Sequence, residues 1–255
     1  MFDDLEYISI KNQTTSFPRH FHETFCISLI FSGVEKIEFE AQELYSESGS
    51  ISITNPFEVH SNPLVDKDVL TSFDTIYIPA ALMKFYARED IMFSNRTIQD
   101  INAIQQFLVL KNALDGKIQN DIHRFLGQFI TTIKPYSQQK HEGYKTVDFE
   151  EFHELDAHIE HHILEKFELE ELSRIANTNK YGFIKKFKLF TGMSPMNYII
   201  MRKIFSSKNR IAPSTNLSEL AYQYNFTDIA HFSKTFKRYV GISPSIYQRK
   251  MINRN

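Results

Sequence analysis

A nine-residue phrase occurs twice near the carboxyl end of this chain. Residues 187–195 read Phe-Lys-Leu-Phe-Thr-Gly-Met-Ser-Pro, and residues 236–244, which begin 49 positions later, read Phe-Lys-Arg-Tyr-Val-Gly-Ile-Ser-Pro. Self-similarity at a fixed spacing indicates a duplicated structural unit. The apolar residues around both copies recur at steps of three and four, which is typical of helices rather than strands. The repeat therefore predicts two similar helical modules.

The second copy is predicted to be two helices joined by a turn. Asn216, followed three residues later by Glu219, resembles a capping box that begins the first helix. Residues 225–227 form the turn, and Thr227 is predicted to cap the next helix, with Asp228 favourable in its first turn. The inward faces of the two helices are expected to be Leu217, Leu220, Ala221 and Tyr224, and then Phe232, Phe236 and Val240.

Both copies carry the same stop and start signals. Gly192 and Gly241 are expected to end their helices in a left-handed conformation. Each is followed by Ser-Pro, in which the serine caps a further helix and the proline takes its first position. The first copy is predicted to turn at Thr178-Asn179, to bury Phe183, Phe187 and Phe190, and to continue into a linking helix over about 195–210.

In each copy of the repeat, the face of the second helix that lies opposite its apolar stripe is basic. A short helix, a tight turn and a helix that is aromatic inside and basic outside form a unit that enters a DNA major groove. The alternative is a helical bundle with a basic solvated face. The outward residues are Tyr181, Ile184, Lys185 and Lys188 in the first copy and Ile229, Ala230, His231, Lys234 and Arg238 in the second.

The charge distribution supports the DNA-binding interpretation. Residues 160–255 hold 16 Lys and Arg against 7 Asp and Glu, a charge of +9, whereas the chain as a whole has a net charge of −2. Such asymmetry suggests that one half meets a polyanion. The hydrophobic content of 42% is typical of a soluble protein, and the acidic amino terminus does not resemble a signal peptide. We therefore expect a cytoplasmic protein without a membrane span.

The segment from Leu220 to Tyr247 closely resembles the signature of the AraC/XylS family of bacterial transcription regulators. The resemblance extends from about 149 to 250, the family's domain of two helix-turn-helix units. Asn225 replaces the usual turn glycine, Lys234 the usual arginine, and Lys203 an arginine of the linking helix. The DNA-facing positions that the resemblance implies are Tyr181, Ile184, Lys185, Ile229, Ala230 and Lys234, with His231 beside them.

The first 95 residues have the alternation of short strands. Ile51 and Ile53 alternate with serines, and Ile76 and Ile78 repeat the pattern. Alternation of period two predicts a small antiparallel barrel or sandwich with one apolar and one wet face. This half of the chain resembles the cupin-like sensor domain of many AraC-type regulators, in which a small barrel holds an effector.

Three histidines in this half are candidates for ligand contacts. His20 and His22 precede one predicted strand, and His60 follows another. Three imidazoles are competent ligands for zinc or iron, but polar lining of an effector pocket or a structural role is the preferred interpretation. We therefore expect no bound metal and no cofactor. The predicted effector contacts are Arg19, His20, His22, Glu58 and His60.

A helical segment separates the two halves. Ile118, Ile122, Leu126, Phe129, Ile130 and Ile133 fall on one stripe, which either packs on the barrel or forms a dimer seam. The predicted organisation is a cupin-like β-barrel (1–95), a helical pair for dimerisation (96–135), a linker (136–147) and an all-α DNA-binding domain (148–255). Its helix-turn-helix units are expected at about 168–190 and 216–240.

The predicted function is a sequence-specific DNA-binding transcription regulator that responds to a small-molecule effector. We expect an activator rather than a repressor, because the family resemblance implies it. The expected partners are double-stranded DNA, the effector, a second copy of the chain and RNA polymerase. We do not expect an enzyme. The alternatives are a metal-dependent cupin enzyme fused to a DNA-binding tail, and a regulator whose amino-terminal half only oligomerises.

Overall fold

The structure, a computed structural model, describes residues 5–66, 68–116, 121–140 and 150–252. The chain divides into two compact units. The first comprises residues 1–16 and 21–146, and the second comprises residues 147–255 together with 17–20. Among the described residues, no helix combines the length and apolar character that crossing a membrane requires.

The first unit is built on a five-stranded antiparallel sheet in the order β1-β8-β3-β6-β10. Ile27 lies opposite Ile53 on one neighbouring strand and Ile76 on the other, so the three side chains point to the same face. All three are fully buried. The strands are β1 (Glu6–Ile10), β3 (Thr24–Ser32), β6 (Ile51–Thr54), β8 (Ser72–Pro79) and β10 (Thr97–Ile98).

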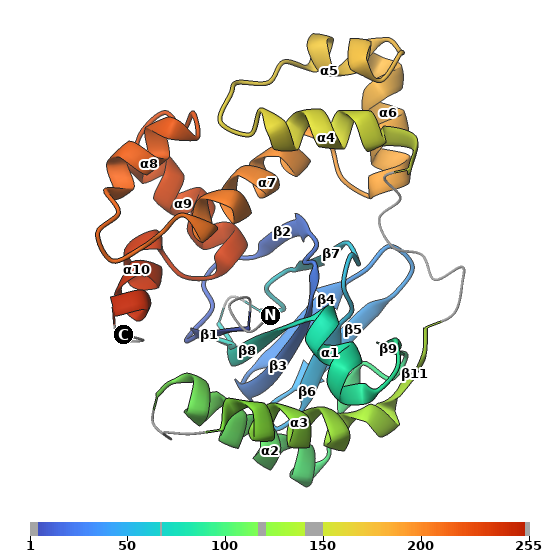
Figure 1. Ribbon diagram of the computed structural model, residues 1–255, viewed down its shortest axis with the longest axis vertical. Coiled ribbons are helices and arrows are strands. Elements are labelled where there is room, and N and C mark those ends of the chain that lie inside the picture. Colours follow the sequence, from blue (N-terminus) through green and yellow to red (C-terminus); the bar gives the residue numbers. More distant parts are fainter. Residues whose placement is uncertain (1–4, 67, 117–120, 141–149, 253–255) are drawn as a thin grey trace. The chain divides into compact units, whose positions relative to one another are not determined.

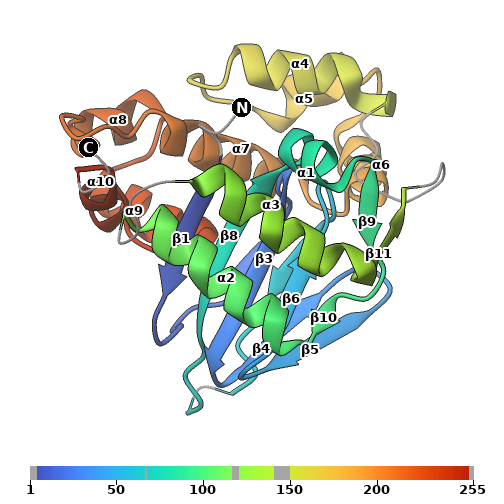
Figure 2. The same cartoon turned by 60° about the horizontal axis from the view of Figure 1, so that its bottom comes forward.

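Helices cover this apolar face (Figure 2). The helices α1 (Ala80–Ala87), α2 (Ile101–Leu114) and α3 (Ile122–Ile133) join the sheet in one hydrophobic cluster. Leu126, Phe129, Ile130 and Ile133 are fully buried within it. The apolar stripe predicted from the sequence is therefore buried against the sheet of the same chain, which is the first of the two alternatives. Ile118 lies outside the described residues.

The second sheet has four strands in the order β2-β7-β4-β5. They are β2 (Phe17–His20), β7 (His60–Asn62), β4 (Val34–Glu38) and β5 (Glu43–Glu47). Within the described part of the chain, the strand pairings leave the two sheets separate, so the expected barrel is an open pair of sheets. The first unit is nevertheless the β-rich domain that the alternation predicted.

The expectation of a wet sheet face was wrong. Ser28, Ser52 and Thr75 lie side by side on the face opposite the helices, and all three are buried. Ser52 Oγ donates to Glu35 Oε2 of the second sheet at 2.5 Å. The polar face is thus an internal layer between two sheets. Alternation shows that two faces differ in polarity, but it does not reveal what covers each face.

Four short elements were not foreseen. The helix α1 follows β8 directly, and β9 (Ile91–Phe93) pairs with β11 (Ser137–Gln139). Residues 134–136 form the 3₁₀ turn η1. Residues 137–139 of the predicted linker are therefore in a strand, and residues 141–147 lie outside the described residues.

The second unit is helical apart from β2 (Figure 1). The linking helix α7 was predicted over about 195–210 and packs against both α6 and α9. The helical elements are η2 (Glu150–Phe152), α4 (His153–His161), α5 (Leu169–Ile175), α6 (Lys180–Thr191), α7 (Pro195–Asn209), α8 (Leu217–Gln223), α9 (Ile229–Val240) and α10 (Pro244–Ile252).

Candidate nucleic-acid interface

The second repeat forms the predicted helix pair α8–α9. Asn216 caps α8, because its side chain accepts hydrogen bonds from the backbone of Ser218 and Glu219 at 3.0 and 3.3 Å. Asn225 takes a left-handed conformation in the turn, with φ of 59°, which asparagine tolerates better than most residues. Asn225 therefore supplies the positive φ of this turn, at the position where the resemblance to the family led us to expect glycine.

One cap was predicted a residue too early. The N-cap of α9 is Asp228, whose carboxylate accepts from the backbone N–H of His231 at 2.7 Å. Thr227 lies before it. Both side chains are good caps, and the choice depends on the turn geometry that the rest of the unit imposes. Behind the cap, Phe232 and Phe236 are fully buried, as the spacing predicted.

The first repeat forms α5–α6 in the same way. Asn179 caps α6 by accepting from the backbone of Gly182 at 2.9 Å. Phe183 and Phe187 are buried, whereas Phe190 is only half-buried. Gly192 and Gly241 both end their helices with positive φ, at 70° and 89°. Left-handed C-caps thus close both second helices, as predicted.

The residues predicted to face DNA lie on the outer sides of α6 and α9. Tyr181 is the most exposed, with 83% of its surface accessible, and Ile184 is half-buried. The remaining exposed side chains are Lys185, Lys188, Ile229, Ala230, His231, Lys234 and Arg238. Because Phe183 and Phe187 of α6 and Phe232 and Phe236 of α9 are buried, these opposite faces are the ones available to an external partner.

Acidic neighbours distinguish the two basic faces. On α6, Lys180 pairs with Glu170 at 2.6 Å, and Lys186 pairs with Glu151. Throughout the described residues, no acidic side chain forms an ion pair with any of the outer basic residues Lys185, Lys188, Lys234, Lys237 or Arg238. The positive charge of α9 is therefore less compensated than that of α6.

Sequence reasoning missed Lys237 as a member of this surface. It is exposed on α9 between Lys234 and Arg238. Its position three residues after Lys234 is the available signal, because residues three apart lie on the same side of a helix.

A buried lysine fixes the two helix pairs to α7. Lys203 is 7% exposed, and its ammonium group donates to the carbonyl oxygens of Glu165 at 2.6 Å and Tyr224 at 3.1 Å. Glu165 precedes α5, and Tyr224 follows α8. Burial lowers the pKa of Lys203 to about 8. This side chain therefore connects both copies of the repeat to one helix.

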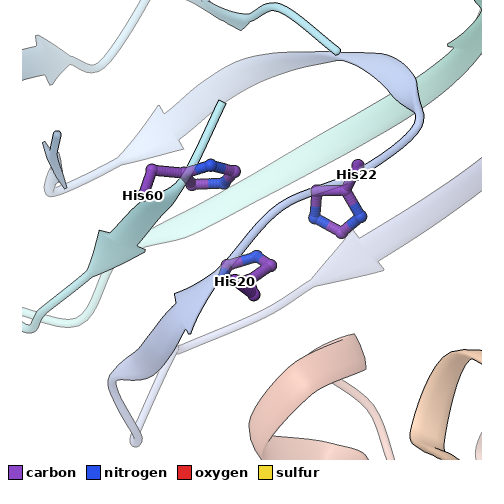
Figure 3. Close-up of side chains that lie close together, drawn as sticks. All are labelled: His20, His22 and His60. Carbon is purple, nitrogen blue, oxygen red and sulfur yellow. The ribbon is translucent and has the colours of Figure 1, made fainter. Parts of the chain in front are cut away.

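The predicted effector contacts are placed in two different environments. His20, His22 and His60 gather with ligand nitrogens within 4.8 Å of one another (Figure 3). Glu58 instead forms an ion pair with Arg96 at 2.5 Å and accepts from the backbone of Asn55. Arg19 is half-buried. The three histidines thus form a cluster, whereas the Glu58 carboxylate is engaged within the protein.

Known families match both units. Residues 172–250 match the family described as a helix-turn-helix domain, and residues 4–127 match the AraC-like ligand binding domain. The chain is 24% identical over 235 residues to the uncharacterized HTH-type transcriptional regulator YbfI of Bacillus subtilis (strain 168), covering 89% of this chain and 85% of that protein.

Two further proteins extend the comparison. The HTH-type transcriptional activator AarP of Providencia stuartii is 30% identical over 92 residues, which are 35% of this chain and 67% of AarP. The crystal structure of ToxT from Vibrio cholerae O395 has a TM-score of 0.58 at 15% identity and covers 98% of both chains. The ToxT likeness shows a shared fold for each unit.

Proposed function

From the premise that this chain belongs to the AraC family of DNA-binding transcription regulators, we propose that α6 and α9 are the elements that read its operator. The observation that carries this proposal is the pair of exposed basic helix faces, each backed by buried phenylalanines. Lysine and arginine side chains attract phosphates and give salt-dependent affinity. The two helices would enter successive major-groove faces about one helical turn apart.

We propose that base contacts are few and that much of the specificity comes from DNA shape. Lysine reaches guanine, but Ile229 and Ala230 offer only apolar contact, which suits thymine methyl groups. Tyr181 presents an exposed aromatic ring at the start of α6. Such a surface favours A+T-tolerant sites that are recognised through the backbone and groove geometry.

We further propose that the first unit binds a small-molecule effector and that the protein acts as a cytoplasmic homodimer which activates transcription through RNA polymerase. The match to an AraC-like ligand binding domain supports the effector, and AarP supports activation. A structure of ToxT from strain SCE256 of Vibrio cholerae was solved with bound unsaturated fatty acid. No catalytic role is proposed.

The test starts from an operator selected out of random DNA by the full-length protein. In gel shifts at several salt concentrations, Lys185→Ala combined with Lys234→Ala should weaken binding by about tenfold or more. It should also reduce the salt slope by about two, because two phosphate contacts are lost. Footprints should show two protected segments about 10 base pairs apart.

A charge-matched control separates local contact from overall charge. Lys11→Ala combined with Lys140→Ala removes the same two charges from exposed positions of the first unit. This control should leave the salt slope unchanged. Equal losses in both double variants, or none in the first, would show that α6 and α9 do not form the interface.

A further inference from the structure

We propose that Glu35 is a proton-sensing group that couples the packing of the two sheets of the first unit to the pH of the surroundings. Glu35 lies on β4 of the four-stranded sheet and is 4% exposed. Its carboxylate accepts a hydrogen bond from Ser52 Oγ of the five-stranded sheet at 2.5 Å and another from the Asn62 side chain of β7 at 3.1 Å. A single carboxyl group thus joins the two sheets. The inference goes beyond the proposed DNA-binding function and does not depend on it.

Neutral polar groups lie around this carboxyl group. Ser46, which is fully buried, lies opposite Glu35 on β5, and Thr97 lies opposite Ser52 on β10. The hydroxyl oxygens of Ser46 and Thr97 are 3.4 Å apart, and the Asn62 amide completes the set. Hydroxyl and amide groups donate hydrogen bonds to a carboxylate but supply no net positive charge. Ionised Glu35 therefore loses its hydration without gaining a counter-ion, which disfavours the charged form.

The charged side chains nearby are paired with one another. Side chains alternate across a strand, so Lys36 points away from the layer between the sheets, and it pairs with Glu38 and Glu43 at 2.7 and 3.0 Å. Arg96, just before β10, pairs with Glu58 at 2.5 Å. Across the described ranges of the chain, the carboxyl group between the sheets forms no ion pair.

Other titratable side chains face the same layer. His60 is two residues before Asn62 on β7, so both side chains lie on the same side of the strand. The ring of His60 donates from Nδ1 to the carbonyl oxygen of Glu58 at 2.8 Å. Register and alternation place further titratable groups on this side of the five-stranded sheet, namely Glu6, Cys26 and Tyr77. The contribution of Glu35 is therefore isolated by comparing two proteins that both keep these groups.

Burial sets the protonation state of Glu35. It raises the pKa of the carboxyl group to about 7, and the hydrogen bonds from Ser52 and Asn62 offset only part of that increase. A glutamate in an unfolded chain has a pKa of about 4.3. Between these two values the folded unit binds more protons than the unfolded chain, so its stability falls as the pH rises through this range. The protonated form therefore favours the packed sheets, and ionisation disfavours them.

The charge acts where the two sheets meet. Ser52 belongs to β6 in one sheet, whereas Glu35 and Asn62 belong to β4 and β7 in the other. Water that enters between these strands hydrates the carboxylate and lowers the free energy of the ionised form. We expect deprotonation to loosen β4 and β7 from β6, so that the pH changes how often the two sheets separate.

The first experiment measures the protonation of Glu35 directly in the full-length protein. Side-chain carboxyl carbons are labelled with ¹³C and followed by NMR from about pH 4 to about pH 9, and the Glu35 signal is the one missing from Glu35→Gln. We expect a midpoint at about pH 7. A midpoint below about pH 5 would overturn the proposal, because the carboxyl group would then be ionised throughout the neutral range.

The second experiment measures the consequence for stability. Urea unfolding with pulsed hydrogen exchange, read in peptides of the first unit, gives the unfolding constant of that unit alone. From about pH 5 to about pH 8 this constant should increase roughly 50- to 100-fold more in the wild type than in Glu35→Gln, as expected for a pKa raised from about 4.3 to about 7. Parallel changes in the two proteins would show that Glu35 does not sense the pH.

A matched control keeps the result specific. Glu47→Gln removes an exposed carboxyl group from the adjacent strand β5, so its pH profile should follow that of the wild type. An equal response of Glu35→Gln and Glu47→Gln would assign the effect to overall charge and overturn the proposal. If Glu35→Gln does not fold, the Glu35 signal is assigned through the backbone resonances of the wild type, and its midpoint decides. Neither experiment contains DNA, so their failure is distinct from a failure of the proposed operator binding.

Discussion

The two helix-turn-helix units differ in their turns although their helices match. The helices α5 and α8 begin 48 residues apart, at Leu169 and Leu217, whereas α6 and α9 begin 49 residues apart, at Lys180 and Ile229. The turn of the second unit is therefore one residue longer. Phe226 lies in this longer turn, and Thr178 occupies the corresponding backbone position in the first unit, as shown by their hydrogen bonds to Ala221 and Ser173.

The two turns lead to different ways of closing the aromatic core. Phe226 is buried, and its ring centroid lies 5.2 Å from that of Phe232 within the same unit. In the first unit the corresponding aromatic is Phe152 of η2, which lies 5.1 Å from Phe187. The second unit is thus closed by its own turn, whereas the first depends on a residue that precedes it in the chain.

The charges follow the same division. Lys180 and Lys186 of α6 pair with acidic residues, and one of these, Glu151, belongs to η2. The first unit therefore uses part of its basic surface to hold the preceding segment. This difference indicates that Lys186 of the first unit has a structural role in holding η2.

The largest expected effect comes from removing the aromatic residue that closes each unit. Phe152→Ala should lower the free energy of unfolding by about 3–5 kcal/mol, because a 3% exposed ring leaves a cavity. Phe226→Ala should lower it less, by about 3 kcal/mol at the lower end of this range, because a turn collapses more easily around the gap. Urea unfolding measures both values.

Hydrogen exchange locates the damage in these two variants. Phe152→Ala should loosen α5 and α6 and leave α8 and α9 protected, and Phe226→Ala should do the reverse. Loss of protection in α9 on replacing Phe152 would mean that the two units share one core.

The next effect concerns Lys203, which connects the two units. Its pKa is about 8 in the folded protein, whereas an unfolded lysine titrates near 10.4. Between these values the unfolded state binds more protons, so stability rises with pH. The wild type should gain about 2 kcal/mol between pH 8 and pH 10 relative to Lys203→Met. Parallel pH profiles of urea unfolding for the two proteins would contradict this prediction.

A smaller effect should separate the two basic faces in DNA binding. Lys234→Ala with Arg238→Ala should weaken operator affinity by about tenfold, more than Lys185→Ala with Lys188→Ala does. Base substitutions in the operator should also be tolerated more readily in the half that α6 contacts. Gel shifts with mutated operators measure both quantities. Equal loss of affinity on mutating either operator half would contradict the prediction that α9 contributes more than α6.

The smallest effect is expected at Gly182, in the first turn of α6. A Cβ at this position would lie 3.0 Å from Thr178 Oγ1, which is the end of a half-buried side chain that can rotate. Gly182→Ala should therefore raise stability by about 0.5 kcal/mol through helix propensity. A lower melting temperature would show that Thr178 is fixed and that the first unit needs glycine there.

Local signals in the sequence were sufficient to identify the repeat. Gly192, Gly241 and the two Ser-Pro starts act through backbone conformation and caps within a few residues, so the printed sequence determines them. Apolar spacing placed Phe232 and Phe236 inside for the same reason. The N-cap of α9 shows the limit of this reasoning. Thr227 was predicted and Asp228 is observed, because both adjacent side chains can cap a helix.

Long-range packing decided the rest. The alternation predicted a solvent-exposed face that contains Ser28, Ser52 and Thr75, but a second sheet covers this face. Alternation alone does not show whether another element packs on a sheet face. Phe152 and Lys203 act on residues tens of positions away. The sequence alone thus determined the two repeated helix pairs, whereas only the tertiary structure covered the polar sheet face and joined both helix pairs to α7 through Lys203.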